Sequence, residues 1–284
     1  MIAKDFNYYS PDTVADAIAL LAEFGGDAKL LAGGHSLLPM MKMRFAEPVN
    51  LIDINGLNEI KGIDIDEENI IIGAMTPEND ILRDDRLETA CPLLFEATKL
   101  IADPQVRNRG TIGGDIAHGD PANDQPSIML ALDATLEITG VEGPRLVAAA
   151  DFFLGTYTTA IQPNELLTRI IIPRAHGSKG WGFQKLKRKT GDYATAASAV
   201  TMRMVDGKCD QVRIALTNLG PKSFRPVKAE WILEGHPPTD DRIEAAVQLA
   251  MAETDPAADQ RGNEEYKTAM AGEMLRRALQ QAMN

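Results

Sequence analysis

Two glycine pairs, at positions 33–34 and 113–114, constrain the fold of this chain more than any other feature. The first stands in Ala32-Gly33-Gly34-His35-Ser36, and the second stands in Thr111-Ile112-Gly113-Gly114-Asp115. Glycine permits positive φ and a close approach of the backbone, and the N–H groups of such a turn beside the start of a helix attract phosphate. The sequence therefore predicts two turns that clasp, from two sides, a ligand with more than one phosphate.

The composition excludes several classes of partner. The chain has 284 residues, and its formal net charge is -12 at pH 7. Nucleic-acid binding needs a surplus of Lys and Arg to neutralise phosphates, so the acidic balance argues against a nucleic-acid partner. No apolar run reaches the length of a membrane span, and residues 1–9 lack the charged-then-apolar layout of a signal peptide. We expect no transmembrane segment and no secretion signal.

The sequence contains two cysteines, Cys91 and Cys209. Two are too few for a disulfide framework, so the reducing cytoplasm is the simplest location. An iron–sulfur cluster usually takes four thiolates, so this chain cannot hold such a cluster by itself.

The hydrophobic pattern divides the chain into three units, which we place at 1–55, 56–177 and 178–284. The first is expected to be a small β-α-β unit. Its helix is opened by Ser10-Pro11-Asp12 and stopped by Gly25-Gly26, and Ser36 is the expected cap of a second, short helix. The pattern predicts strands at 29–32 and 49–54 and the short helix at 37–43.

The second and third units are expected to be α+β. In the second, strands are predicted at 59–65, 69–74, 134–139 and 165–172, and helices at 77–84, 92–100 and 125–132. Residues 174–178 are interpreted as a linker. In the third, an antiparallel sheet is predicted from 182–186, 196–204 and 211–216, covered by helices at 227–234, 242–252 and 263–283.

Neither glycine pair has the Gly-x-Gly-x-x-Gly spacing of a dinucleotide fold, and no Gly-x-x-x-x-Gly-Lys-Ser/Thr occurs, which disfavours the NAD and P-loop interpretations. Taken alone, the first pair is equally compatible with a strand-to-helix turn that uses glycine for its geometry only. The surroundings of the second pair are more specific. Arg107-Asn108-Arg109-Gly110 leads into that pair, and Ala117-His118-Gly119-Asp120-Pro121-Ala122-Asn123-Asp124 follows it.

Together these motifs resemble the FAD-binding medium subunits of molybdenum hydroxylases, the family of aerobic carbon monoxide dehydrogenase and, as a domain, xanthine dehydrogenase. Residues 185–194 are similar to the segment that this family lays beside the flavin ring. Residues 261–267 and 274–279 resemble its C-terminal helical signature. The resemblance covers essentially the whole chain, and the layout looks closest to the carbon monoxide dehydrogenase branch.

The resemblance implies a two-part FAD-binding domain of the vanillyl-alcohol oxidase/p-cresol methylhydroxylase type, followed by a C-terminal domain with an antiparallel sheet covered by helices. It implies FAD bound without a covalent bond, and no catalytic or metal-binding residue on this chain. The residues that it implies in cofactor binding are Ala32, Gly33, Gly34, His35, Ser36, Leu37, Thr76, Thr111, Ile112, Gly113, Gly114, Asp115, Asp124, Leu166, Lys185, Asp192 and Tyr193.

The resemblance also implies a place for each group of residues along the cofactor. Residues 32–37 and 111–115 would hold the diphosphate, and Thr76 would approach the cofactor. Asp124 and Leu166 would lie at the ribose and adenine end, whereas Lys185, Asp192 and Tyr193 would reach the isoalloxazine ring. Asp115 departs from the Asn or Ser more usual at its position. A carboxylate there would repel the diphosphate unless it were turned away or hydrogen-bonded.

The activity implied is electron transfer within a larger enzyme. Electrons would pass from a small subunit with 2Fe-2S clusters, through this chain, to an external acceptor. Oxidation of carbon monoxide, an aldehyde or an N-heterocycle would occur on a large subunit with the molybdenum cofactor, in a dimer of heterotrimers. Two alternatives stay open at this point. One is a stand-alone flavin oxidoreductase of the same broad fold, and the other is a flavin-binding assembly protein without turnover.

Overall fold

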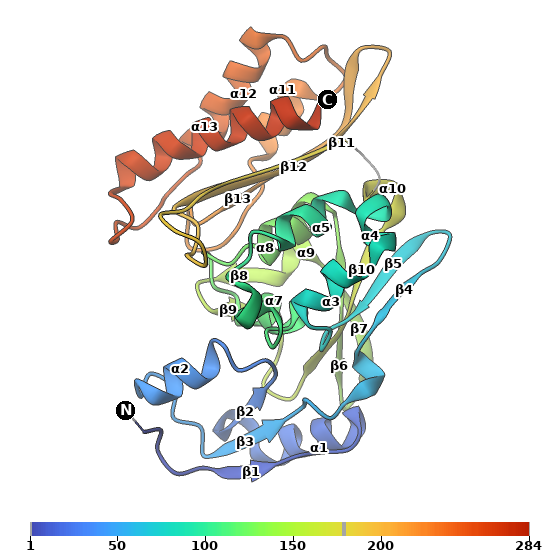
Figure 1. The fold of residues 1–284 in the computed structure, drawn as a ribbon, viewed down its shortest axis with the longest axis vertical. Helices are drawn as coiled ribbons and strands as arrows, with labels where there is room; N and C mark the ends of the chain where they lie inside the picture. The colour runs from blue at the N-terminus through green and yellow to red at the C-terminus, as the bar shows by residue number, and fades with distance from the viewer. Residues whose placement is uncertain (1, 178–179, 284) are drawn as a thin grey trace.

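The computed structural model describes residues 2–177 and 180–283, which build three main sheets arranged along the long axis of the molecule (Figure 1). The first sheet is parallel, with strand order β1 (Asn7–Tyr9), β3 (Asn50–Asp53) and β2 (Ala28–Leu31). Helix α1 (Val14–Phe24) precedes β2, and α2 (Leu37–Lys42) connects β2 to β3. The expected β-α-β unit is present, and β1 is a strand that the sequence pattern did not predict.

The core of this first sheet is completed from outside it. Ala17 and Leu21 of α1 pack with Ile52 of β3, as their helical spacing predicts. Two later residues, Met75 and Leu166, belong to the same buried cluster. The first sheet therefore shares its core with the second.

Two expected helix caps are wrong. Helix α1 is capped by Thr13, whose hydroxyl oxygen accepts a hydrogen bond of 3.1 Å from the Asp16 N–H, and not by the earlier Ser10. Ser36 precedes α2, but its side chain makes no capping hydrogen bond. Its backbone has αR geometry rather than the extended geometry from which a serine hydroxyl reaches back to the helix N–H groups.

The second sheet has five strands in the order β4 (Ile63–Ile65), β5 (Asn69–Gly73), β10 (Leu166–Pro173), β6 (Thr135–Gly140) and β7 (Gly143–Ala148). All its pairs are antiparallel. Strand β4 is shorter than expected because residues 58–60 form a 3₁₀ turn, and β7 was not predicted. A small hairpin of β8 (Phe153–Gly155) and β9 (Thr158–Thr159) lies beside it.

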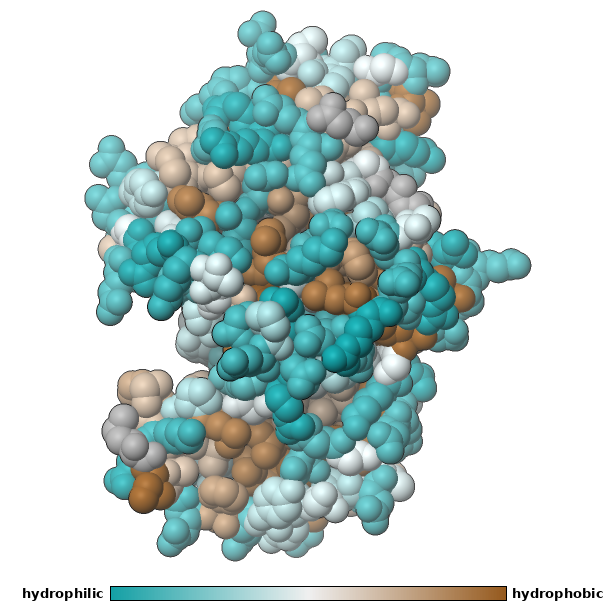
Figure 2. Space-filling view, in the orientation of Figure 1, coloured by the Kyte–Doolittle hydropathy of each residue, from teal (hydrophilic) through white to brown (hydrophobic). Residues whose placement is uncertain are grey.

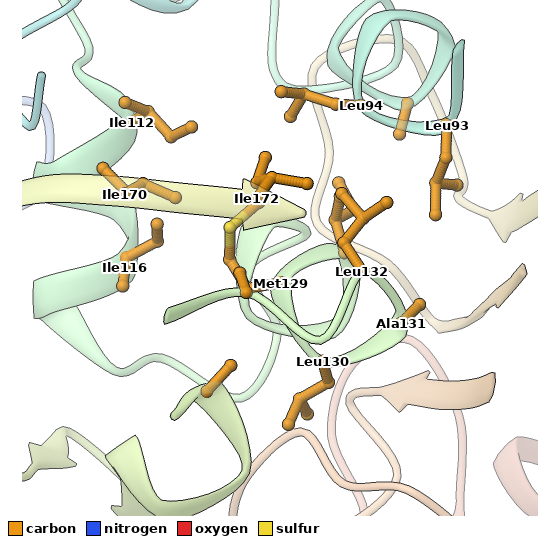
Figure 3. Packing of buried hydrophobic residues seen from close by; sticks show 14 of the residues in the cluster. Leu93, Leu94, Ile112, Ile116, Met129, Leu130, Ala131, Leu132, Ile170 and Ile172 are labelled. Atoms are coloured by element: carbon orange, nitrogen blue, oxygen red, sulfur yellow. The ribbon is translucent and has the colours of Figure 1, made fainter. Parts of the chain in front are cut away.

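Eight short helices surround this sheet among the described residues: α3 (Glu78–Arg83), α4 (Asp85–Ala90), α5 (Pro92–Thr98), α6 (Pro104–Arg107), α7 (Ile112–His118), α8 (Gln125–Ala131), α9 (Ala149–Phe152) and α10 (Arg174–Gly177). Figure 3 shows Ile170 and Ile172 of β10 among the apolar side chains of α5, α7 and α8. Helix α10 occupies most of the expected linker, and Ser178 at its end lies outside the described residues.

The second glycine pair does not form a turn. Gly113 and Gly114 lie in the first turn of α7, and neither has positive φ. Thr111 starts this helix, because its side-chain oxygen accepts a hydrogen bond of 3.2 Å from the Gly114 N–H. The low helix propensity of glycine is outweighed here by close packing, since a Cβ on Gly113 would lie 2.5 Å from the Ala74 Cβ.

The third sheet is antiparallel, in the order β11 (Gly180–Leu186), β12 (Ala196–Val205) and β13 (Lys208–Thr217). Helices α11 (Val227–Leu233), α12 (Asp240–Ala252) and α13 (Glu264–Ala282) cover one face (Figure 1). Gly182 permits this contact, because a Cβ there would lie 2.0 Å from the Ala278 carbonyl oxygen. The expected antiparallel sheet covered by helices is confirmed.

The opposite face of the third sheet packs on the second unit. Ala197, Ala199 and Phe183 belong to the same buried cluster as the side chains of α5 and α8. The Thr201 hydroxyl donates a hydrogen bond of 2.8 Å to the Ala131 carbonyl oxygen across this contact. Within the described part of the chain, no helix is both long and apolar enough to cross a membrane.

Candidate functional site

The two glycine segments meet at the contact between the first and second sheets. A Cβ on Gly33 would lie 2.3 Å from the Arg109 carbonyl oxygen and 2.7 Å from the Gly110 Cα. These are backbone atoms, which cannot move aside as the end of a side chain can. In Figure 2 the outline of the molecule is indented between the first sheet and the units above it, on the side where Figure 1 places α2 and α7. Gly33 therefore lies where two backbones need glycine to come together.

The first glycine segment is an open turn of the kind predicted. Gly34 has a φ of 77°, in the left-handed region that favours glycine. In the part of the chain that the structure describes, the backbone N–H groups of Gly33, Gly34, His35 and Ser36 donate no hydrogen bond. Successive N–H groups of this kind form a concave anion-binding surface.

Asn55, which was not predicted as a site residue, fixes the backbone just before this turn. The Asn55 side-chain amide donates hydrogen bonds of 2.8 Å to the Ala32 carbonyl oxygen and 2.7 Å to the Asp53 carboxylate. Asn55 follows β3 in a turn and has no motif around it, so only the long-range contact with residue 32 identifies its role.

The second glycine segment differs from its prediction. The N–H groups of Ile112 and Gly113 donate to the carbonyl oxygens of Thr76 and Ala74, at 3.1 and 2.9 Å, and the Gly114 N–H donates to Thr111. The expectation that this segment presents free N–H groups is therefore wrong, because the segment that follows β5 and the cap of α7 accept their hydrogen bonds. Its glycines serve close packing instead, since a Cβ on Gly114 would lie 2.8 Å from the Thr111 Oγ1.

Several candidate residues lie in cores or turns around the two segments. Ile112, the first residue of α7, is fully buried in the same cluster as β10, and Leu166 is buried in the core of the first sheet. The Thr76 hydroxyl bonds with the backbone of Gly62 and is also buried. These residues support the glycine segments from behind. Among the other candidates, His35 is exposed, and Leu37 is the first residue of α2.

A cluster of acidic side chains lies behind the second segment. We call Glu78, Asp115 and Asp124 the acid cluster. Glu78 is 2% exposed and accepts a hydrogen bond of 3.0 Å from the side-chain amide of Gln125. Within the described ranges, no hydrogen bond reaches Glu78 Oε1, Asp115 Oδ1, Asp124 Oδ1 or Gln125 Oε1, all inaccessible to solvent. Neither Glu78 nor Gln125 was predicted, because no local pattern marks them.

Burial sets the ionisation of this cluster. Burial and the nearby Asp124 charge raise the pKa of Glu78 to about 8, although Gln125 and Arg107 oppose the shift. Burial, with the charges of Glu78 and Asp124, raises the pKa of Asp115 well above its usual range. The raised pKa favours the protonated form of Asp115, and a protonated carboxyl group does not repel an anion as a carboxylate would. Burial thus weakens the expected conflict between Asp115 and a diphosphate.

Asp124 and Lys185 form a buried ion pair between the second and third sheets. The Lys185 ammonium lies 2.5 Å from Asp124 Oδ2 and also donates to the Leu100 carbonyl oxygen, and its side chain is 1% exposed. Burial raises the pKa of the Asp124 carboxyl, and Lys185 opposes that shift. The resemblance placed Asp124 at the ribose and adenine end of the cofactor and Lys185 at the isoalloxazine ring. The ion pair brings the two side chains together.

Asp192 and Tyr193 lie in the connection between β11 and β12. Asp192 accepts hydrogen bonds of 2.7 Å from Arg261 and 3.0 Å from Arg188, and these lower its pKa to about 2. The Tyr193 ring is 42% exposed, and the Arg261 guanidinium lies 5.6 Å from its centre. Partial burial and the charges of Asp120 and Asp115 raise the pKa of Tyr193 to about 12, so its hydroxyl keeps its proton. Arg261 thus fixes both residues from the turn that precedes α13.

Comparisons with known proteins match nearly the whole chain to flavoprotein subunits of one family. Residues 4–175 match the family model "FAD binding domain in molybdopterin dehydrogenase", and residues 181–282 match "CO dehydrogenase flavoprotein C-terminal domain". The chain is 51% identical to the carbon monoxide dehydrogenase medium chain of Hydrogenophaga pseudoflava, over 99% of this chain and 98% of that one. It is 48% identical to the corresponding chain of Afipia carboxidovorans, with the same coverage. The solved structure of the Hydrogenophaga pseudoflava enzyme superposes with a TM-score of 0.98, covering 100% of this chain and 99% of that one at 52% identity.

Proposed function

This chain belongs to the family of FAD-binding medium subunits of molybdenum hydroxylases, and from that premise we propose that it relays electrons to an external acceptor in an enzyme that oxidises carbon monoxide. The electrons enter from an iron–sulfur subunit. The choice of carbon monoxide is supported by the two relatives that are carbon monoxide dehydrogenase medium chains. Aldehydes and N-heterocycles are the other substrate classes to be tested.

One observation carries the cofactor assignment. Residues 33–36 present four consecutive backbone N–H groups with no hydrogen-bond partner among the described residues, at a turn where a Cβ would collide with the facing backbone. Such N–H groups suit the diphosphate of FAD. Gly33 and Gly34 would bring the diphosphate to the backbone. Asp115 would lie beside it, and its raised pKa would favour the uncharged form that does not repel an anion.

The residues of the third unit would serve the isoalloxazine end. Tyr193 offers an exposed ring of which Arg261 fixes the position, and Asp192 stays ionised because two arginines hold it. Lys185 would act on that end through its pairing with Asp124, since its own ammonium is buried. FAD, when bound, accepts two electrons and releases them one at a time, which suits it to join an iron–sulfur donor to an acceptor.

The assembly follows from the same premise. We propose a small subunit with 2Fe-2S clusters and a large subunit with the molybdenum cofactor, in a dimer of heterotrimers located in the cytoplasm. Both cysteines of this chain are free thiols, which agrees with a reducing compartment and leaves the clusters to a partner. We also propose that the chain divides at 1–55, 56–177 and 178–284, which is supported by the three separate sheets.

The test uses the complex purified after co-expression with both partner subunits. Anaerobic carbon monoxide is expected to bleach the flavin absorbance of the complex and to leave the separately purified 284-residue chain unchanged. Bleaching by an aldehyde or an N-heterocycle alone would change the substrate and keep the relay. Bleaching of the separate chain would instead support a stand-alone oxidoreductase, and a complex whose flavin no substrate bleaches would support an assembly protein.

We predict that the FAD is released by acid precipitation of this complex. No cysteine lies in either glycine segment, and Cys91 and Cys209 are both buried. The yellow colour should therefore pass into the supernatant and match the protein in molar amount. Flavin that stayed with the pellet after washing would contradict non-covalent binding.

A further inference from the structure

The acid cluster sits directly behind the glycine segments. The Glu78 N–H donates a hydrogen bond of 2.9 Å to the Gly110 carbonyl oxygen, and Gly110 is one of the residues that Gly33 touches. Asp115 follows Gly114 in α7. Glu78 is thus joined by one hydrogen bond, and Asp115 by one peptide bond, to the glycine residues that would form the cofactor cradle.

The groups that face the cluster come from several elements. Arg107 of α6 and Lys185 of β11 supply positive charge, and Lys187 lies next to Lys185 with its ammonium on the same carbonyl oxygen of Leu100. Asp120, between α7 and α8, adds negative charge beside Asp115. Gln125 of α8 donates its amide N–H to Glu78, while its own Oε1 atom accepts no hydrogen bond within the described residues.

Several buried carboxyl oxygens of the acid cluster have no hydrogen-bond donor among the described residues. Lys185 engages only one oxygen of Asp124, and Gln125 engages only one oxygen of Glu78. Buried polar oxygens usually have partners, and an unpaired one is costly. A proton on one of these carboxyl groups gives it an O–H donor, and it limits the negative charge buried in one place.

We propose that Glu78 and Asp115 form a redox-linked proton site, which takes up a proton from solvent when the cofactor in the adjacent cradle is reduced. The inference rests on the proposed function, because it needs FAD at the glycine segments. A two-electron reductant such as dithionite would supply the electrons. Bound FAD would take two electrons and one proton and so leave one added negative charge in the cradle. The added negative charge would favour the protonated form of the cluster. A proton would then move from hydronium or buffer to a carboxylate oxygen of the cluster, so one bond to hydrogen breaks on the donor and one O–H bond forms on the carboxyl group. Reoxidation returns that proton to solvent.

The direction of the pKa change on reduction determines at which pH the extra proton uptake occurs. Glu78 has a pKa of about 8, so near pH 8 it is half ionised while the cofactor is oxidised. Negative charge nearby raises that pKa, and protons are then bound. Near pH 6 the group is already protonated and can bind nothing more. Excess uptake of a fraction of a proton per flavin is therefore expected near pH 8 and not near pH 6.

The experiment measures proton uptake with a pH indicator while the weakly buffered complex is reduced by stoichiometric dithionite. Glu78→Gln, which keeps the acceptor for Gln125, is expected to lose the excess uptake near pH 8. Glu88→Gln, which removes an exposed carboxylate from α4, is the matched control and should keep it. Equal uptake by the wild type and Glu78→Gln would overturn the proposal.

A measurement on the wild type alone makes the test independent of whether a variant folds. The infrared difference spectrum between reduced and oxidised complex should gain intensity in the C=O stretch of protonated carboxyl groups near pH 8. The Asp115→Asn variant should alter that band. A flavin-containing complex without such a band overturns the proton site and leaves the electron relay standing. A complex purified without flavin overturns the proposed function and the proton site with it.

Discussion

Replacing Gly33 with alanine is expected to remove most of the FAD from the purified complex. The new Cβ would lie 2.3 Å from the Arg109 carbonyl oxygen and 2.7 Å from the Gly110 Cα. Overpacking of this kind costs about 1–3 kcal/mol, and here it separates the two segments that would hold the cofactor. If that cost falls on the bound state, FAD affinity drops by about fivefold to 140-fold. The measurement is the molar ratio of FAD to protein, followed by titration of the complex with FAD.

Gly26→Ala is the matched control for this change. Gly26 also lies in the first unit, its φ is not positive, and a Cβ there would meet no atom within 4 Å. The same chemical substitution is therefore expected to keep full FAD occupancy and the same Tm. Full occupancy in Gly33→Ala would show that the meeting of the two segments does not form the cofactor site.

Replacing Lys185 with methionine is expected to cause the largest loss of stability. The change leaves the buried Asp124 carboxylate without its cation, and breaking a buried pair in this way costs about 3–5 kcal/mol. For a chain of this size such a loss lowers the Tm by roughly 6–20 °C. Adding Asp124→Asn should recover part of the loss, because the uncompensated charge is then gone.

The exposed pair Lys4–Glu47 provides the control. Its side chains are 57% and 36% exposed, so Lys4→Met should cost no more than about 1 kcal/mol. A Tm loss in Lys185→Met no greater than in Lys4→Met would mean that the Asp124–Lys185 pair does not hold the second and third units together.

The loss in Lys185→Met should depend on pH in a defined direction. Burial already raises the pKa of Asp124, and without Lys185 the pKa rises further. A carboxyl whose folded pKa exceeds its unfolded value costs nothing below the unfolded pKa, about 3.9, and destabilises progressively as the pH rises through the folded pKa. The Tm difference between variant and wild type should therefore be small near pH 4 and large at neutral pH.

The family, the fold class and the first glycine turn could be predicted from the sequence because their signals are local. Residues 32–36 lie next to one another, and the resemblance to FAD-binding medium subunits is confirmed by both family models. Apolar spacing also identified most strands and helices to within a few residues. Short strands such as β1 and β7 were missed, because exposed residues dominate both segments.

The chemistry of the site was less predictable because it depends on distant partners. Whether a glycine N–H is free is decided by the carbonyl group that faces it. The Ile112 and Gly113 N–H groups donate hydrogen bonds to the carbonyl oxygens of Thr76 and Ala74, and no sequence motif predicts these bonds. The acid cluster likewise assembles from α3, α7 and α8, and Lys185 joins it from β11. Glu78 could be found only once these elements were placed together.

The shared core of the first sheet bears on how the protein unfolds. Met75 and Leu166 complete a cluster otherwise built from residues 17–60, so a fragment that ended at residue 55 would leave apolar side chains without their cover. Although the first and second sheets are separate in topology, the units that contain them should therefore unfold together as one cooperative unit. Loss of structure around α1 and around β10 should occur in a single transition, and amide hydrogens of β3 and β10 should exchange with solvent at similar free energies of opening.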